Sequence, residues 1–86
     1  MRVQAVAGVA IQQLDDEATL LHPTGGSALT LNATALAIWA RCATPIEVDG
    51  LVAALADNYG VAPDTIDGQV RATVQQLLDL GYAESD

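Results

Sequence analysis

The fold is decided by residues 27–41, which read SALTLNATALAIWAR. Leu29 and Leu31 alternate with small or polar residues, which is the period of a strand with one buried face. Asn32 follows at once and is a strong helix N-cap residue, because its side chain can accept a hydrogen bond from a free backbone N–H of the first turn. Apolar side chains then recur at helical spacing up to Arg41. We therefore expect a strand that passes directly into a helix.

Two more strands are predicted before this one, over residues 9–14 and 18–22. The acidic residues 15–17 separate these two strands, and Pro23-Thr24-Gly25-Gly26 precedes the strand over residues 27–31, because Pro and Gly favour tight turns. Such short connections join antiparallel neighbours. Three strands alone are marginally stable, so helices must cover one face of this meander.

Two further helices are predicted after it. Thr44-Pro45-Ile46-Glu47 has the form of a capping box with Pro at the first helical position. The helix that it starts runs to about Tyr59, before the stop signal Gly60. Pro63 opens the last helix, which ends at Leu80. The predicted fold class is α+β and winged-helix-like, a three-stranded antiparallel meander followed by three helices.

The last predicted helix carries two neighbouring stripes of side chains. A core stripe contains Ile66, Val70, Thr73, Leu77 and Leu80. A second stripe beside it contains Asp67, Arg71, Val74 and Leu78. Exposed apolar groups next to an arginine would form the wall of a groove. One wide core face explains the same pattern, and the sequence leaves both interpretations open.

Composition limits what the chain can bind and where it works. Its 86 residues include eleven acidic and three basic side chains, which give a net charge of −8. Nucleic acids and anionic membranes attract clustered Lys and Arg, whereas Arg2, Arg41 and Arg71 are scattered. No segment approaches the ~18 apolar residues of a membrane span. The start of the chain does not look like a signal peptide, and a single Cys suits a reducing compartment, so we expect a cytoplasmic protein.

The chain offers few groups for catalysis or metal binding. It contains one His, one Cys and no Lys, whereas zinc needs three or four N or S ligands. A nucleophilic pair of Cys42 and His22 is formally open. The sequence favours a buried structural Cys42, an exposed turn at His22 and a core position for Trp39. We expect no enzyme activity, no metal and no cofactor, and therefore a function in binding.

The strand over residues 27–31 offers a place for a partner. It would lie at an edge of the meander with unpaired backbone groups, and it contains no charged residue and no Pro that would hinder pairing. A peptide could add there as a fourth strand. If the last helix packs beside this edge, its second stripe would line the cleft, and Val74 and Leu78 would select apolar side chains.

The ordered residues of the helical part resemble PqqD-like proteins. The resemblance is carried by Leu31-Asn32, Ala35, Ile38-Trp39, residues 51–56, Tyr59-Gly60-Val61, Pro63, Val70, Leu77-Leu78 and Leu80-Gly81. It spans residues 9–83, which we expect to form a single domain between an N-terminal segment, residues 1–8, and a C-terminal tail, residues 84–86. The chain departs from the pattern at Gln69, where many relatives have an acidic residue, and at Tyr82, where they usually have Leu.

The resemblance implies a RiPP recognition element, a winged-helix-type domain that binds the leader segment of ribosomally made precursor peptides and presents them to modifying enzymes. Members of the family take the leader as an added strand between the third strand and the third helix. The short chain, with its Gly-Gly-Ser turn, looks like the discrete partner of lasso-peptide proteases. The residues that the resemblance assigns to peptide binding are Ser27, Ala28, Leu29, Thr30, Leu31, Asp67, Arg71, Val74 and Leu78.

Three kinds of function remain open at this stage. The first is a peptide chaperone, a monomer or weak dimer, that binds a leader and delivers it to a tailoring enzyme such as a leader peptidase. The second is a homodimeric adaptor that uses the same sheet edge, which would show as a concentration-dependent mass. The third is a winged-helix DNA-binding regulator, which the single cation of the last helix, Arg71, disfavours.

Overall fold

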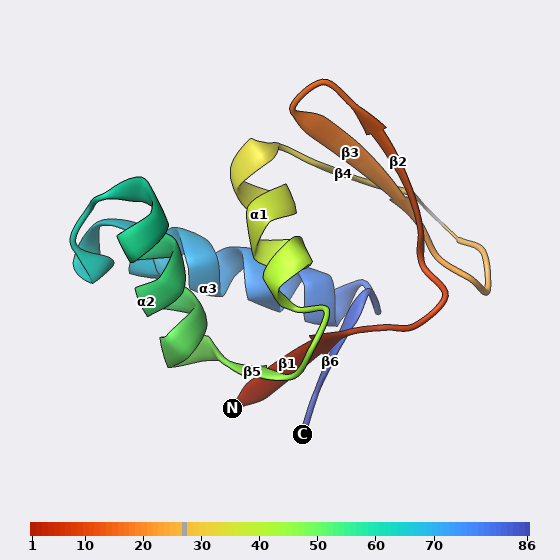
Figure 1. Cartoon of the computed structure of the whole chain (residues 1–86). Coiled ribbons are helices and arrows are strands. Elements are labelled where there is room, and N and C mark those ends of the chain that lie inside the picture. Colours follow the sequence, from red (N-terminus) through yellow and green to blue (C-terminus); the bar gives the residue numbers. More distant parts are fainter. Residues whose placement is uncertain (27) are drawn as a thin grey trace.

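The computed structural model describes residues 1–26 and 28–86 and places a sheet before three helices (Figure 1). The sheet is antiparallel, in the order β2-β3-β4, and its strands are β2 (Ala10–Leu14), β3 (Glu17–Leu21) and β4 (Leu29–Leu31). The helices are α1 (Ala33–Arg41), α2 (Val48–Tyr59) and α3 (Pro63–Asp79). The predicted α+β class, with a three-stranded antiparallel meander followed by three helices, is confirmed.

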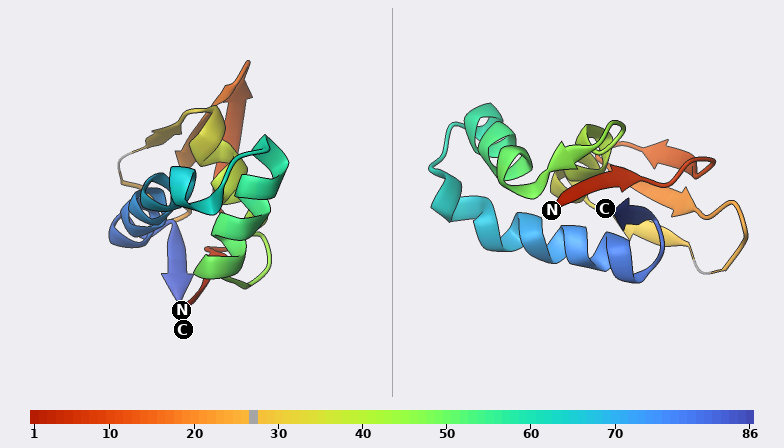
Figure 2. Two further views of the ribbon diagram at one scale, coloured as in Figure 1. Left: turned by 90° about the vertical axis from the view of Figure 1, so that its left-hand side faces the viewer. Right: turned by 90° about the horizontal axis from the view of Figure 1, so that it is seen from below.

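The two ends of the chain form a second sheet that the sequence analysis did not predict. Its central strand is β1 (Arg2–Ala5), which pairs antiparallel with β5 (Ile46–Glu47) on one side and with β6 (Ala83–Ser85) on the other. The N- and C-termini therefore lie next to each other (Figure 2). Strands of two to four residues carry little periodicity, which is why the pattern of the sequence does not reveal them.

The predicted capping box at Thr44 is wrong, and the second sheet explains why. Ile46 and Glu47 are paired with β1, so α2 begins at Val48. Glu47 at the N-cap makes no side-chain capping bond, and the Val48 N–H donates instead to the Met1 carbonyl oxygen at 3.0 Å. The end of the chain thus supplies the acceptor for a free backbone donor in the first turn of α2, where no side chain caps the helix.

The other local signals mostly hold. The Asn32 side chain accepts a hydrogen bond from the Ala35 N–H at 2.8 Å, and Gly60 ends α2 in the left-handed conformation at φ 69°. The turn between β2 and β3 is one residue shorter than predicted, because Asp15 adopts φ 56° and Glu17 already pairs in β3. β4 begins only at Leu29, and the predicted strand residue at position 27 lies outside the described residues.

The core is aliphatic and draws on both sheets and all three helices. Its fully buried members include Val3, Leu20, Leu31, Ile38, Leu51, Leu55, Val70 and Leu77. Trp39 is half-buried and packs against this cluster. On α3 the predicted core stripe is wrong at Leu80, which is 50% exposed, whereas Val74 of the second stripe is 2% exposed, as one wide core face predicts. Gly81, at φ 78°, turns the chain so that Tyr82 fills the core in place of Leu80.

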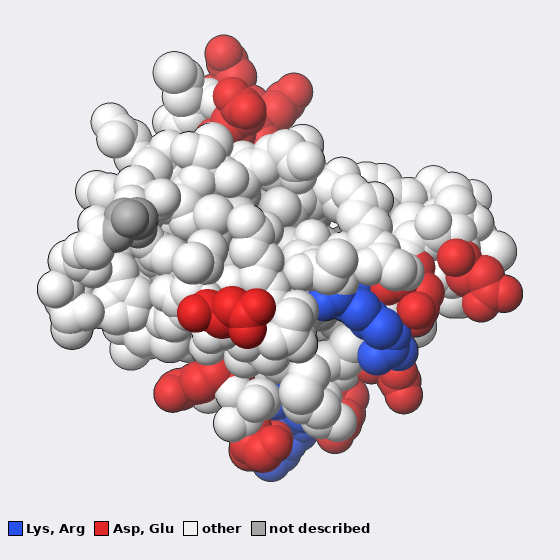
Figure 3. All heavy atoms as spheres, turned by 180° about the vertical axis from the view of Figure 1, so that it is seen from behind, with Lys and Arg blue, Asp and Glu red and all other residues white. Residues whose placement is uncertain are grey.

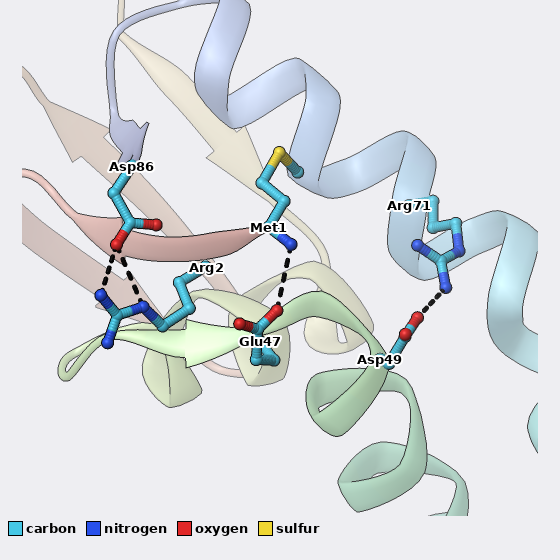
Figure 4. A network of polar contacts seen from close by, with 6 residues as sticks. All are labelled: Met1, Arg2, Glu47, Asp49, Arg71 and Asp86. Carbon is cyan, nitrogen blue, oxygen red and sulfur yellow. Dashed lines mark hydrogen bonds and ion pairs between the residues drawn. The ribbon is translucent and has the colours of Figure 1, made fainter.

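Ion pairs at the surface join the N-terminal strand to the C-terminal residue and to β5 (Figure 4). The Arg2 side chain donates from Nε to the Asp86 carboxylate at 3.0 Å, and the Met1 amine donates to the Glu47 carboxylate, also at 3.0 Å. Both pairs are largely exposed to water, so each contributes little to stability. The hydrogen bond from Arg2 nevertheless holds the pKa of Asp86 below its ordinary 3.8.

We expect Asp86→Asn to remove part of the acid sensitivity of the fold. The folded-state pKa of Asp86 is lowered, so its contribution to the free energy of unfolding is present above the unfolded value of 3.8 and is lost as the pH falls through the folded pKa. The difference in Tm between the wild type and this variant should therefore shrink between about pH 6 and about pH 2.5. Thermal melts followed by circular dichroism measure it. Glu84→Gln, in the same terminal strand, is the matched control, and a Tm difference for Asp86→Asn that stays constant across the range would contradict the prediction.

Candidate functional site

β4 is an edge strand whose outer side is open. It pairs with β3 alone among the described strands, and β6, which ends the chain, pairs with β1 instead. The edge is therefore not filled by the protein's own C-terminal strand. An open strand edge presents backbone donors and acceptors to any extended chain that can lie alongside it.

The register of the sheet shows which backbone groups face that opening. Leu14 and Glu17 close the two-residue turn between β2 and β3, and residues in this position exchange both of their backbone hydrogen bonds. Bonded and non-bonded pairs alternate along an antiparallel ladder. Thr19, which pairs with Gln12, therefore directs its backbone groups toward β2.

The residues on either side of Thr19 direct their backbone groups the other way, toward β4. They pair with Leu29 and Leu31, so Thr30, opposite Thr19, directs its N–H and C=O away from the sheet and into the open edge. The hydroxyl oxygens of Thr19 and Thr30 lie 3.4 Å apart, which fits the close side-chain spacing of a non-bonded pair. Thr30 is thus the residue of β4 that offers both a donor and an acceptor to an added strand.

The side chains of β4 mostly serve the fold. Leu31 is 2% exposed and Leu29 is half-buried against the core, whereas Thr30 and the preceding Ala28 are exposed. Any partner at this edge would consequently contact the backbone of β4 more than its side chains, apart from Ala28 and Thr30.

A hollow of about 360 Å³ lies where the segment before β4 meets the end of α3. It is lined by His22, Thr24, Gly25, Gly26, Ala28, Asp79, Leu80 and Tyr82. The lining residues between positions 22 and 28 form one wall, and the last turn of α3 with the residues that follow it forms the other. This volume is at the small end of the range for ligand pockets, so it suits single side chains.

The His22 side chain forms hydrogen bonds to both walls of the hollow. The prediction of an exposed turn residue at this position is therefore wrong. The Thr24 backbone N–H donates to Nδ1 at 3.2 Å, and Nε2 lies 2.9 Å from the Gly81 carbonyl oxygen. Because Nδ1 accepts, Nε2 carries the proton and donates to Gly81. The imidazole also meets the Tyr82 ring edge to face, with 5.4 Å between the centroids.

The predicted α3 residues divide into an ion pair and a core contact. Arg71 donates from Nε to both carboxylate oxygens of Asp67, at 3.0 and 3.1 Å, and a terminal nitrogen reaches Asp49 on α2 (Figure 4). These hydrogen bonds, first the one to Asp49, raise the pKa of Arg71. Val74 lies in the core and Leu78 is half-buried against it. The structure therefore brings Asp67 and Arg71 together but turns Val74 inward.

Figure 3 shows the face opposite to that of Figure 1. White atoms cover much of this face, and acidic groups in red are spread along its rim, with fewer basic groups in blue. An open backbone edge in acidic surroundings favours a peptide over a polyanion as a partner.

The lone cysteine, which is the remaining candidate for a reactive side chain, is part of the core. Cys42 is fully buried, and burial raises the pKa of its thiol, so it remains protonated in the core. Across residues 1–26 and 28–86, no three His, Cys, Asp or Glu side chains gather closely enough to hold a metal ion. None of the helices in that part of the chain is long and apolar enough to cross a membrane.

Sequence reasoning missed most of the hollow. Its lining residues come from a turn and from a helix end that are more than fifty positions apart, and no local pattern links them. Tyr82 carried the one available signal, because it departs from the family pattern directly after a glycine. The carboxylate of Asp79 at the end of α3 was not recognised, since charged side chains at helix ends are usually solvated.

Comparisons with known proteins agree with this architecture. A family model described as coenzyme PQQ synthesis protein D (PqqD) matches residues 17–83, which include β3, β4, all three helices and the hollow. A solved structure described as TbiB1 in complex with the TbiA(beta) leader peptide shares the fold, with a TM-score of 0.79 and 24% sequence identity over 96% of both chains. No curated protein is significantly similar to the chain in sequence.

Proposed function

The chain belongs to the PqqD family, and from this premise we propose that it is a non-catalytic chaperone for the leader segment of a ribosomally made precursor peptide. The observation that carries the proposal is the open edge of β4, where Thr30 directs both of its backbone groups outward beside a hollow. The fold shared with a protein that was solved with a leader peptide supports it.

In this proposal the leader adds to the sheet as a fourth strand, next to β4. The backbone of Thr30 would exchange two hydrogen bonds with the leader, and exposed Ala28 would leave room for its side chains. Affinity then comes largely from the backbone, and specificity comes from the side chains that reach α3 and the hollow. A disordered leader loses conformational entropy as it binds, which offsets part of these interactions.

The residues proposed to contact the leader are those of the sequence analysis, residues 27–31 with Asp67, Arg71, Val74 and Leu78. The exposure of each side chain indicates how directly it could contact the leader. Thr30 and Ala28 are open to a partner, and Leu78 is half-buried at the side of α3. The Leu31 and Val74 side chains lie in the core, so they would act by supporting the surface rather than by touching the peptide.

Delivery is the second part of the proposed function. A leader held here keeps the rest of its precursor near any enzyme that binds the same complex, which raises the effective concentration of substrate at that enzyme. We place the protein in the cytoplasm and regard a leader peptidase, as in lasso-peptide formation, as the tailoring enzyme that fits best.

Titration calorimetry tests the proposal, with the leader of a short precursor peptide identified by reading the neighbouring genes. We expect saturable one-to-one binding with a negative heat-capacity change, because apolar surface is buried as the leader orders. A scrambled leader of the same composition is the control. Equal binding of the native and scrambled leaders, or none of either, would refute the proposed function.

The homodimeric alternative uses the same open edge, so it needs its own test. Two copies would each bring a net charge of −8 to the contact, and this repulsion opposes self-association. We therefore expect a constant monomer mass in light scattering over a wide range of concentrations. A mass that rises with concentration and falls when leader is added would favour the adaptor function.

A further inference from the structure

We propose that the hollow beside β4 holds a cationic side chain of the bound leader, a Lys or an Arg. The inference rests on the proposed function and specifies the class of leader that the site selects. It follows from the charge at the end of α3, the lack of a compensating cation there, and the apolar walls of the hollow.

Two sources of negative potential meet at the hollow. Asp79 is the last residue of α3, it is exposed, and it is one of the residues that line the hollow. The C-terminal end of a helix also carries a partial negative charge, so an acidic residue there is unfavourable for the helix itself. The carboxylate accepts one hydrogen bond, at 2.8 Å, from the neutral amide of Gln75, which leaves its charge uncompensated.

No cation among the described lining residues balances this charge. His22 accepts a hydrogen bond at Nδ1 and donates from Nε2 to the Gly81 carbonyl, which is the arrangement of an uncharged imidazole. The nearest cation along α3, Arg71, lies eight residues away, or ~12 Å of helix rise. Arg71 is already shared by the carboxylates of Asp67 and Asp49.

The ion pairs of Arg71 extend the preference for a cationic over an acidic leader further along α3. One guanidinium between two carboxylates leaves a net charge of −1, so this segment of α3 does not attract an acidic leader. Arg71 remains one of the residues proposed to contact the leader, and it would do so from within an acidic cluster.

The shape of the hollow fits a long cationic side chain. Ala28, Leu80 and Tyr82 are the lining residues that provide apolar surface, and Leu80 is 50% exposed. Lys and Arg lay their methylene stems against apolar surface and keep the charged head at the rim. Asp79 lines the same hollow and would receive that head. A glutamate would be repelled, and a purely apolar side chain would leave the charge of the carboxylate uncompensated.

Binding of the leader to Asp79→Asn tests the inference. We expect this variant to lower the affinity of the native leader by roughly fivefold, and Asp79→Lys to lower it by more than ~10-fold, because the second replaces attraction by repulsion. Asp64→Asn is the matched control, since Asp64 is exposed in the first turn of the same helix, about 22 Å of helix rise away. Its affinity should match that of the wild type.

A double-mutant cycle identifies the leader residue. Each Lys and Arg of the leader is changed in turn to Gln, and the Asp79→Asn effect should vanish for one of these leaders only. Affinity unchanged by Asp79→Asn, or an equal effect with every leader variant, would overturn the inference. So would tight binding of a leader that contains no Lys or Arg. In all three results the leader still binds, so the proposed function would stand, whereas a wild-type protein that binds no leader refutes that function itself.

Discussion

A Thr30→Pro variant is expected to bind the leader at least ~10-fold more weakly than the wild type while keeping its fold. Proline has no backbone N–H, and the N–H of Thr30 faces the open edge rather than β3. The substitution therefore removes a donor from the added strand and leaves the β3–β4 ladder intact. The pyrrolidine ring also projects toward the space that the leader backbone would occupy. Calorimetry with the native leader measures the loss.

The opposite edge of the same sheet supplies a matched control. Gln13 pairs with Ala18, which directs its backbone groups toward β4, so the N–H of Gln13 also faces outward, from β2. Gln13→Pro removes an equivalent donor, and it should leave leader affinity unchanged. Unfolding melts should place both variants near the wild type. If both proline variants bind the leader as the wild type does, strand addition at β4 is excluded.

Replacement of Tyr82 by Ala is expected to cause the largest loss of stability, about 3–5 kcal/mol. Tyr82 is 2% exposed, its ring packs against His22, and its hydroxyl donates to the Leu20 carbonyl at 3.2 Å. A domain of this size has a total free energy of unfolding of only ~4–13 kcal/mol. We therefore expect Tm to fall by ~15–25 °C, as followed by circular dichroism.

The other tyrosine of the chain, Tyr59, provides a matched control for the Tyr82 variant. Tyr59 ends α2 and is 46% exposed, so Tyr59→Ala should change the free energy of unfolding by less than ~1 kcal/mol. Tyr82→Phe keeps the ring and loses the hydroxyl, and it should cost about 1 kcal/mol. Similar losses for Tyr82→Ala and Tyr59→Ala would show that Tyr82 is not part of the core.

Local sequence signals predicted the parts of the fold that depend on neighbouring residues. Asn32 caps α1 and Gly60 ends α2, because each acts on backbone groups within one turn of itself. The alternation of Leu29 and Leu31 similarly identified β4. These features need no information about the rest of the molecule.

The errors arose where distant segments meet. The Thr44 capping box failed because β1 pairs with Ile46 and Glu47, and the phase of α3 was misjudged because Tyr82 takes the place that Leu80 was expected to fill. The hollow was missed for the same reason. Tertiary packing overrides local propensity at such points, and one sequence contains no direct record of it.

The antiparallel pairing of β1 with β6 has a consequence for engineering. The two termini lie side by side, on a sheet separate from the one that contains Thr30. The whole domain can therefore be grafted into a surface loop of another protein, or circularly permuted through a short linker, without altering its exposed strand. Such a graft would give a host enzyme a binding site for substrates that carry the leader peptide as a tag.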